Sequence, residues 1–194
     1  MAKKNTATRR EEIVAAAALL FRQKGYAATT MRELGEQVGM EAASMYNHIK
    51  GKDELLREIC LSVAEAYMRQ MAAIKTDIPS PIEQLKALIR FHVRIVFDDA
   101  NRISVANNEW KHLPEPALSA FKAARDAYES GMYDMIQEGV RRGEVNAVDP
   151  SVALYTALSA VRWVEFWFRP DRSIAPETLE DNIIRLLMNG LQKN

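Results

Sequence analysis

Hydrophobic residues recur every three or four positions along almost the whole chain, and no segment alternates between hydrophobic and polar residues for long enough to predict a β-strand. Glycines and prolines divide this pattern, because both residues favour the ends of helices. The predicted helices span residues 8–24, 30–38, 42–49, 52–75, 81–98, 101–112, 116–142, 150–169 and 176–192. We therefore expect an all-α protein of nine helices.

Two of these helices are short and lie on either side of Gly39, which gives the backbone the freedom to make a tight turn. Leu34 and Val38 lie four residues apart on the first helix. Met45 and Ile49 lie four apart on the second, so each helix has one apolar face. The other face of the second helix carries Ala42, Ala43, Ser44, Asn47 and His48. This layout predicts a helix-turn-helix whose second helix reads base edges in the major groove of DNA.

These residues resemble the N-terminal signature of the TetR-like repressors. The matching positions are Arg10, Ile13, Ala16, Ala17, Leu20, Phe21, Gly25, Thr29, Thr30, Leu34, Gly39, Tyr46, His48, Lys52, Glu54 and Leu55. The resemblance implies a nine-helix TetR-like fold, with a helix-turn-helix DNA-binding domain in residues 1–50 and a ligand-binding and dimerisation domain in residues 51–194. The departures from the signature leave the operator sequence open: Glu41 replaces a Ser or Thr cap, Ala43 a Gly, Met45 a Leu, Asn47 an aromatic residue or His, and Ile49 a Phe.

The charge distribution agrees with a DNA-binding end. The whole chain has 26 Lys and Arg against 26 Asp and Glu. Residues 1–52 hold nine of the cations and five of the acids, a net charge of +4, so the rest of the chain carries −4. A basic segment on an acidic body is typical of a phosphate-binding head, and an ordinary asymmetry of solvated charge is the alternative.

The predicted contacts to the DNA backbone are Thr30, Tyr46 and Lys52, and the resemblance supports all three. Thr29 and the five residues of the second helix complete the DNA-binding set, although His48 equally fits a capping or packing role. Either Arg9 and Arg10 or Lys3 and Lys4 could form a basic arm near the DNA backbone or minor groove, with a disordered tail as the alternative.

The last two predicted helices suit a contact between two copies of the chain. Apolar residues surround nearly the whole of helix 150–169, so one packed face does not account for them. The last helix offers a stripe of Leu179, Ile183, Leu186, Leu187, Gly190 and Leu191. We expect a homodimer, which matches a palindromic double-stranded DNA operator. The alternative is a helix buried inside a larger monomeric core.

In this family the fifth to eighth helices commonly enclose a ligand cavity. The resemblance implies a lining drawn from Phe91, His92, Ile95, Asn107, Trp110, Phe121, Tyr128, Met132, Met135, Arg162, Trp163 and Phe166. Aromatic side chains with a few polar groups suit a small hydrophobic inducer with one anchoring end. Core packing is the alternative role for about half of these residues.

Two segments are similar to the branch of the family that senses acyl-CoA thioesters from fatty-acid, aromatic or steroid breakdown. They are residues 167–170, before the last helix, and residues 107–113. Arg94, Arg162 and Arg169 are cations that would meet phosphates or a thioester. The competing interpretation is a multidrug or flavonoid sensor that controls an efflux pump.

An enzyme has little support in the sequence. Glu109 and His112 have an E-x-x-H spacing, but a di-iron bundle needs a second such pair and two more carboxylates. No other metal or nucleophile motif is present, so we expect no catalytic residue, metal or cofactor. A helical-bundle enzyme or carrier remains the alternative from another class.

We expect a cytoplasmic protein, because no apolar run is long enough to span a bilayer. The predicted function is a transcriptional repressor released from its operator by the inducer. An activator, or a protein that has lost its ligand response, is the alternative within the class.

Overall fold

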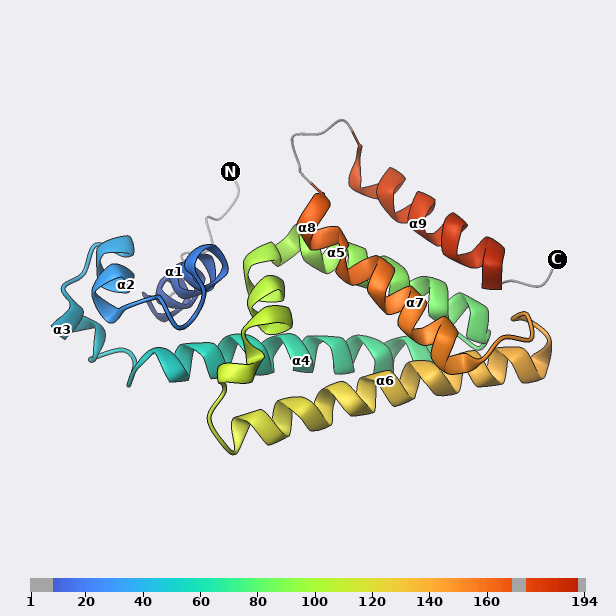
Figure 1. Ribbon diagram of the computed structural model, residues 1–194, viewed down its shortest axis with the longest axis horizontal. Coiled ribbons are helices and arrows are strands. Elements are labelled where there is room, and N and C mark those ends of the chain that lie inside the picture. The colour runs from blue at the N-terminus through green and yellow to red at the C-terminus, as the bar shows by residue number, and fades with distance from the viewer. Residues whose placement is uncertain (1–8, 169–173, 192–194) are drawn as a thin grey trace. The chain divides into compact units, whose positions relative to one another are not determined.

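The computed structural model describes residues 9–168 and 174–191, and the secondary structure within these ranges is helical, without a β-strand (Figure 1). The elements are α1 (Arg9–Lys24), α2 (Met31–Gln37), α3 (Ala42–Met45), α4 (Lys52–Asp77), α5 (Pro81–Asn108), the short 3-10 helix η1 (Trp110–His112), α6 (Ala117–Arg142), α7 (Pro150–Arg162), α8 (Val164–Trp167) and α9 (Pro176–Leu191). The predicted all-α class is confirmed. None of the described helices is long and apolar enough to cross a membrane.

Three helix boundaries differ from the prediction. The helices expected at 81–98 and 101–112 form one element, α5, which is kinked at Asp99 (φ −152°, ψ 69°) and is followed by η1. The helix expected at 150–169 is divided at Trp163 into α7 and α8. The recognition helix α3 ends at Met45, and the next three residues form turns. No glycine or proline marks any of these three points, so the sequence carried no signal for them. The predicted limits at Thr8, Arg169 and Gln192 lie outside the described residues.

Two compact units, each with its own hydrophobic core, make up the chain. The first unit contains residues Met1–Ala64 and Asn101–Lys122, and the second contains Glu65–Ala100 and Ala123–Asn194. Helices α4, α5 and α6 therefore supply residues to both units. The boundary that we predict at residue 50 separates DNA binding from ligand binding, and it stays a prediction.

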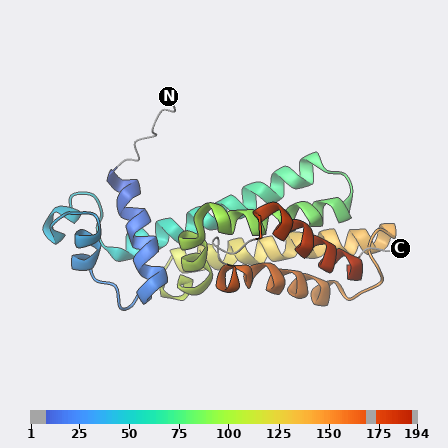
Figure 2. The same ribbon diagram turned by 90° about the horizontal axis from the view of Figure 1, so that it is seen from above.

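The first unit holds the helix-turn-helix, in which α2 contacts both α1 and α3 (Figures 1 and 2). Phe21 of α1, Leu34 of α2 and Met45 of α3 are completely buried and meet in one core. Cys60 lies in this core too, and burial raises the pKa of its thiol to about 12, so the thiol is protonated at neutral pH.

The turn into α3 passes very close to α2. A Cβ atom added to Gly35 would lie 2.5 Å from the carbonyl oxygen of Met40 and 3.4 Å from the backbone nitrogen of Ala42. Gly39 has a φ of +66°, in the left-handed region that glycine adopts without strain. Gly35 therefore permits the close approach of α2 to the turn, and Gly39 permits the change of chain direction.

In the second unit, α7 and α9 pack against each other. Leu154 and Val161 of α7 share a buried core with Leu179, Ile184 and Met188 of α9. Other apolar side chains of α7, α8 and α9 and of Trp163, which lies between α7 and α8, remain exposed; they are Val152, Tyr155, Trp163, Phe166, Trp167 and Leu186. These helices are thus apolar on two sides but buried on one.

Substitution of Gly35 by Ala should destabilise the protein, because the new methyl group meets a backbone oxygen that cannot move aside. We expect a loss of about 1–3 kcal/mol in the free energy of unfolding, the usual effect of overpacking. Denaturant titration measures it.

The matched control is Gly51→Ala, since a Cβ atom at Gly51 meets nothing within 4 Å and its φ is not in the left-handed region. Equal stability of the two variants would contradict the role given to Gly35.

Candidate functional site

The recognition helix and the turn that follows it present most of the predicted base-contacting residues to solvent. Met45 and Ile49 are buried and fix the helix to the core. Ala43, Asn47 and His48 are exposed, and Ala42 and Ser44 are half-buried. The surface that we predict to face bases is therefore accessible.

Arg10 of α1 ties the end of the helix-turn-helix to α4. Its guanidinium donates to the backbone oxygen of His48 at 2.7 Å, and it forms ion pairs of 2.6 Å with Glu54 and with Glu58. The two carboxylates raise the pKa of Arg10. The backbone N–H of Lys50 and the guanidinium of Arg10 lower the pKa of Glu54. One side chain thus holds the segment after α3 against the start of α4, and the family signature had marked Arg10 without revealing this role.

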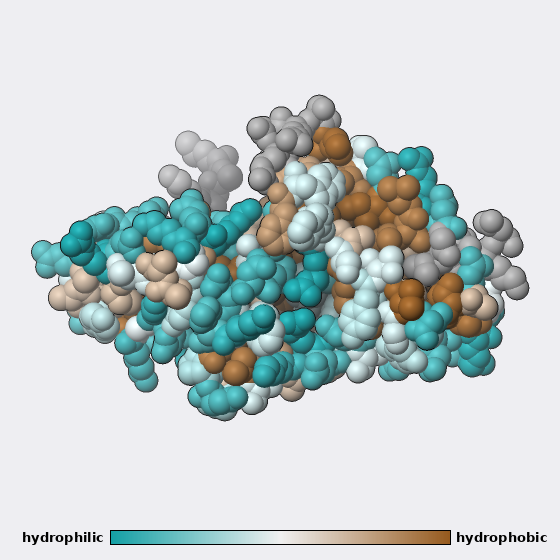
Figure 3. Space-filling model, viewed as in Figure 1, coloured by the Kyte–Doolittle hydropathy of each residue, from teal (hydrophilic) through white to brown (hydrophobic). Residues whose placement is uncertain are grey.

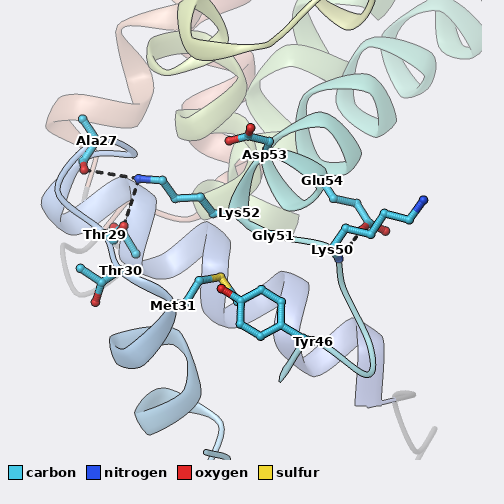
Figure 4. Close-up of a pocket in the computed structure, with 10 residues that line it drawn as sticks. All are labelled: Ala27, Thr29, Thr30, Met31, Tyr46, Lys50, Gly51, Lys52, Asp53 and Glu54. Atoms are coloured by element: carbon cyan, nitrogen blue, oxygen red, sulfur yellow. Dashed lines mark hydrogen bonds between the residues drawn. The ribbon is translucent and has the colours of Figure 1, made fainter. Parts of the chain in front are cut away.

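A pocket of about 560 Å³ lies beside the start of α2 and the start of α4 (Figure 4). Its walls include Thr29, Thr30, Tyr46, Lys50 and Lys52. Thr30 caps α2 in a reciprocal pair of hydrogen bonds with Glu33, and it is exposed. The side chain of Tyr46 is 57% exposed and also available.

Lys52 and Thr29, the other two predicted DNA contacts in this pocket, form hydrogen bonds within the protein. The ammonium group of Lys52 donates to the backbone oxygens of Tyr26, at 2.9 Å, and of Thr29, at 3.1 Å. Figure 4 shows it directed at this loop, while the amine of Lys50 points the other way. Thr29 is buried, and its hydroxyl donates to the backbone oxygen of Gly25 at 2.9 Å. Lys52 and Thr29 therefore stabilise the loop that leads into α2.

Tyr26 joins this loop to the segment that follows α5. Its hydroxyl donates to Asp53, its backbone N–H donates to Glu109 at 3.1 Å, and its ring stacks on His112 with 5.3 Å between centroids. Glu109 and His112, the residues with E-x-x-H spacing, thus both contact Tyr26. Sequence reasoning missed Tyr26, because its partners are 27 to 86 positions away and no local pattern connects them.

The twelve predicted ligand-binding residues are divided between the two units. Asn107, Trp110 and Phe121 belong to the first unit, where Trp110 stacks on Phe121 with 6.0 Å between ring centroids. The other nine belong to the second unit. Met132 and Met135 are buried in its core, Ile95 is half-buried, and Trp163 and Phe166 are exposed in contact with each other.

A polar cluster surrounds His92 in the second unit. The His92 Nε2 atom lies 2.9 Å from the hydroxyl oxygen of Tyr128. The ring of Tyr67, from α4, contacts the rings of Phe91, His92 and Tyr128 at centroid distances of 4.8 to 5.3 Å. No sequence pattern links Tyr67 with His92, which lies on another helix, and only the tertiary contacts connect them.

The groups of this cluster are neutral at physiological pH. Burial, and then the charge of Arg162, lower the pKa of His92 to about 3. Burial also raises the pKa of the Tyr67 and Tyr128 phenols. The arrangement is suited to hydrogen bonds with a neutral polar group. Arg94 is an ion-pair partner of Glu180 at 2.7 Å, and Arg169 lies outside the described residues.

Comparison with known proteins identifies the family. Residues 13–59 match bacterial regulatory proteins of the tetR family. Residues 79–191, more than half of the chain, match the tetracyclin repressor-like C-terminal domain. The chain belongs to the tetR family. It is a helix-turn-helix transcriptional regulator.

Several members of the tetR family resemble the chain over nearly its whole length. The HTH-type transcriptional repressor KstR2 of Mycolicibacterium smegmatis is 23% identical over 97% of this chain and 93% of its own. The crystal structure of AibR in complex with isovaleryl coenzyme A and operator DNA is 26% identical, with a TM-score of 0.82 over 92% of this chain and 97% of AibR. The structure of the ketosteroid transcriptional regulator KstR2 of Mycobacterium tuberculosis has the same fold, with a TM-score of 0.91 at 19% identity over 96% of each chain.

Replacement of Arg10 by Gln should loosen this tetR-family helix-turn-helix and reduce the free energy of unfolding by roughly 1 kcal/mol at pH 7, because the ion pairs are partly exposed. The pKa of Glu54 is lower in the folded protein than in the unfolded chain, where it is about 4.3. The ion pair therefore contributes fully to the free energy of unfolding above the unfolded-state pKa, and this contribution disappears as the pH falls through the folded-state pKa. Urea titrations of both proteins between pH 7 and pH 3 should show the difference shrinking below about pH 4. A difference that stays constant over this range would contradict the ion-pair explanation.

Proposed function

We propose that this tetR-family regulator is a repressor that binds a palindromic operator as a homodimer and leaves it when an acyl-CoA thioester binds. The observation that carries the proposal is the similarity, over nearly the full length, to AibR, whose structure contains both isovaleryl coenzyme A and operator DNA. Such a protein works on DNA in the cytoplasm and needs no catalytic group.

For the DNA contacts, the accessible side chains support a division of roles. Tyr46 and Thr30 are exposed beside the pocket of the first unit and would hold phosphates, with the charge of Lys52 behind them. Ser44, Asn47 and His48, with Ala42 and Ala43, would meet base edges. Thr29 would act indirectly, since its hydroxyl holds the loop that precedes α2.

The exposed apolar residues of the second unit support a homodimer. Val152, Tyr155, Trp163 and Phe166 are spaced so that they follow one side of α7 and α8, and each is about half exposed or more. Leu186 of α9 is 75% exposed. Hydrophobic residues also gather on the visible surface where α9 lies (Figure 3). A second copy of the same helices would cover these residues in a two-fold interface.

For the inducer, the cluster around His92 supports a thioester ligand. The neutral His92 and the phenols of Tyr67 and Tyr128 suit a thioester carbonyl, and the surrounding rings suit an acyl chain. The phosphates of coenzyme A would remain near Arg162, outside the buried cluster, because burial of unpaired charge is costly. Binding releases DNA if the thioester prefers the state whose two heads no longer fit the operator.

One experiment tests the DNA and the ligand together. Duplexes selected from a random library by the purified protein should be palindromic, and their affinity should fall steeply with salt because phosphate contacts release counterions. Isovaleryl-CoA and longer acyl-CoA thioesters should then weaken binding by roughly 5- to 150-fold, the usual range of allosteric coupling.

A comparison of ligands and a variant of Tyr46 separate the proposed function from its alternatives. The free acids should act more weakly than the thioesters, and planar drugs should have no effect; release by the drugs alone would replace the acyl-CoA proposal with the efflux regulator. Tyr46→Phe should weaken binding roughly tenfold on every duplex alike and leave the response to thioesters intact.

The homodimer has a separate test in Leu186→Glu. The leucine is exposed in the single chain, so the variant should fold normally, but in a dimer the charge would be buried without a partner at a cost of several kcal/mol. Light scattering should give a dimer mass for the wild type and a monomer mass for the variant.

The control for this charge change is Gln137→Glu, on the exposed side of α6, which should remain dimeric. A dimer mass for Leu186→Glu would exclude α9 from the interface.

A further inference from the structure

Glu41, at the start of the recognition helix, has a carboxylate with no partner among the residues that the structure describes. It immediately precedes α3, it is exposed, and its side chain makes no capping hydrogen bond. No hydrogen bond or ion pair of its side chain occurs among the described residues. Every other acid between residues 9 and 58 has a partner; Glu12 pairs with Arg9, Glu33 with Lys24, and Glu36 with Arg32.

Neither stability nor attraction to DNA explains a glutamate at this place. Ser, Thr, Asp or Asn caps a helix better than the longer Glu. On a surface that approaches phosphates, a free carboxylate is repelled, so Glu41 weakens binding to any duplex unless a donor compensates it. In a complex with DNA, amino groups on the base edges are donors that would supply this compensation.

The packing of the backbone fixes the position of residue 41, from which this side chain extends. The carbonyl carbon of Glu41 lies 3.5 Å from the position of a Cβ atom on Gly35, so α2 packs directly on residue 41 while the side chain stays in solvent. In helix-turn-helix proteins the N-terminal residues of the recognition helix contact base edges. Glu41 has this position, next to the half-buried Ala42 and the exposed Ala43. Both are too small to block it.

The chemistry of the major groove then selects one base. Guanine offers two acceptors there, and thymine offers an acceptor and a methyl group, so both disfavour a carboxylate. Adenine has an amino donor, but its N7 acceptor lies beside it and repels the second carboxylate oxygen. Cytosine offers its N4 amino group without an adjacent acceptor. We infer that Glu41 is a specificity-determining residue that accepts a hydrogen bond from the N4 amino group of a cytosine in each half of the operator.

This inference rests on the proposed binding of α3 in the major groove, and selection from a random duplex library tests it with four proteins. The wild type should select one cytosine per half-site and prefer it roughly tenfold to a hundredfold over the other bases. Glu41→Ala should lose the preference at that position alone, to within about twofold, and retain the rest of the sequence. Glu41→Gln should change the cytosine to adenine, since an amide pairs with the N6 and N7 atoms of adenine.

Glu36→Gln is the matched control, because it removes the same charge from another exposed acid of the head. It should change affinity for all duplexes alike and leave every base preference intact. If Glu41→Ala behaves like this control, Glu41 acts only through its charge and the inference is wrong while the regulator still binds an operator. If the wild type selects no sequence, the proposed function fails as well.

Discussion

The position of the recognition helix depends on the bridge that Arg10 makes between α1, the end of the helix-turn-helix and α4. A helix of four residues such as α3 has too few internal hydrogen bonds to be stable alone. It is held from three sides: by the close packing of its first turn on Gly35, by the burial of Met45, and by the bond from Arg10 to the His48 carbonyl. These constraints leave the opposite side of α3 in solvent, where a transcriptional regulator meets its DNA.

The core of the second unit differs from that of the first, because it contains hydrogen-bonded polar side chains among its apolar residues. The histidine and the two tyrosines around it remain neutral because burial shifts each pKa away from the charged form. Burial of a neutral, hydrogen-bonded group costs less desolvation free energy than burial of an ion, so the core tolerates these side chains. The ligand that we propose for this cluster would therefore meet only uncharged polar groups there, and its charged groups would lie toward Arg162.

Local signals in the sequence were reliable where a helix ends at a glycine or begins at a proline. The end of α1 before Gly25 and the start of α7 at Pro150 are examples, and each depends only on neighbouring residues. The kink at Asp99 and the break at Trp163 have no such marker and were missed. For the same reason, Tyr67 was missing from the predicted lining residues, although its ring contacts both His92 and Tyr128, which were among them.

The sequence by itself determined the all-α class and the helix-turn-helix, because these depend on periodicity and on residues a few positions apart. Only the tertiary structure decided which charged side chains form hydrogen bonds or ion pairs and which have no partner among the described residues. Lys52 proved to be bound to backbone oxygens, Arg94 to Glu180, and Glu41 to no described residue, although all three are ordinary charged positions in the sequence. Pairing depends on distances between elements that are far apart along the chain, and those distances exist only after the cores have formed.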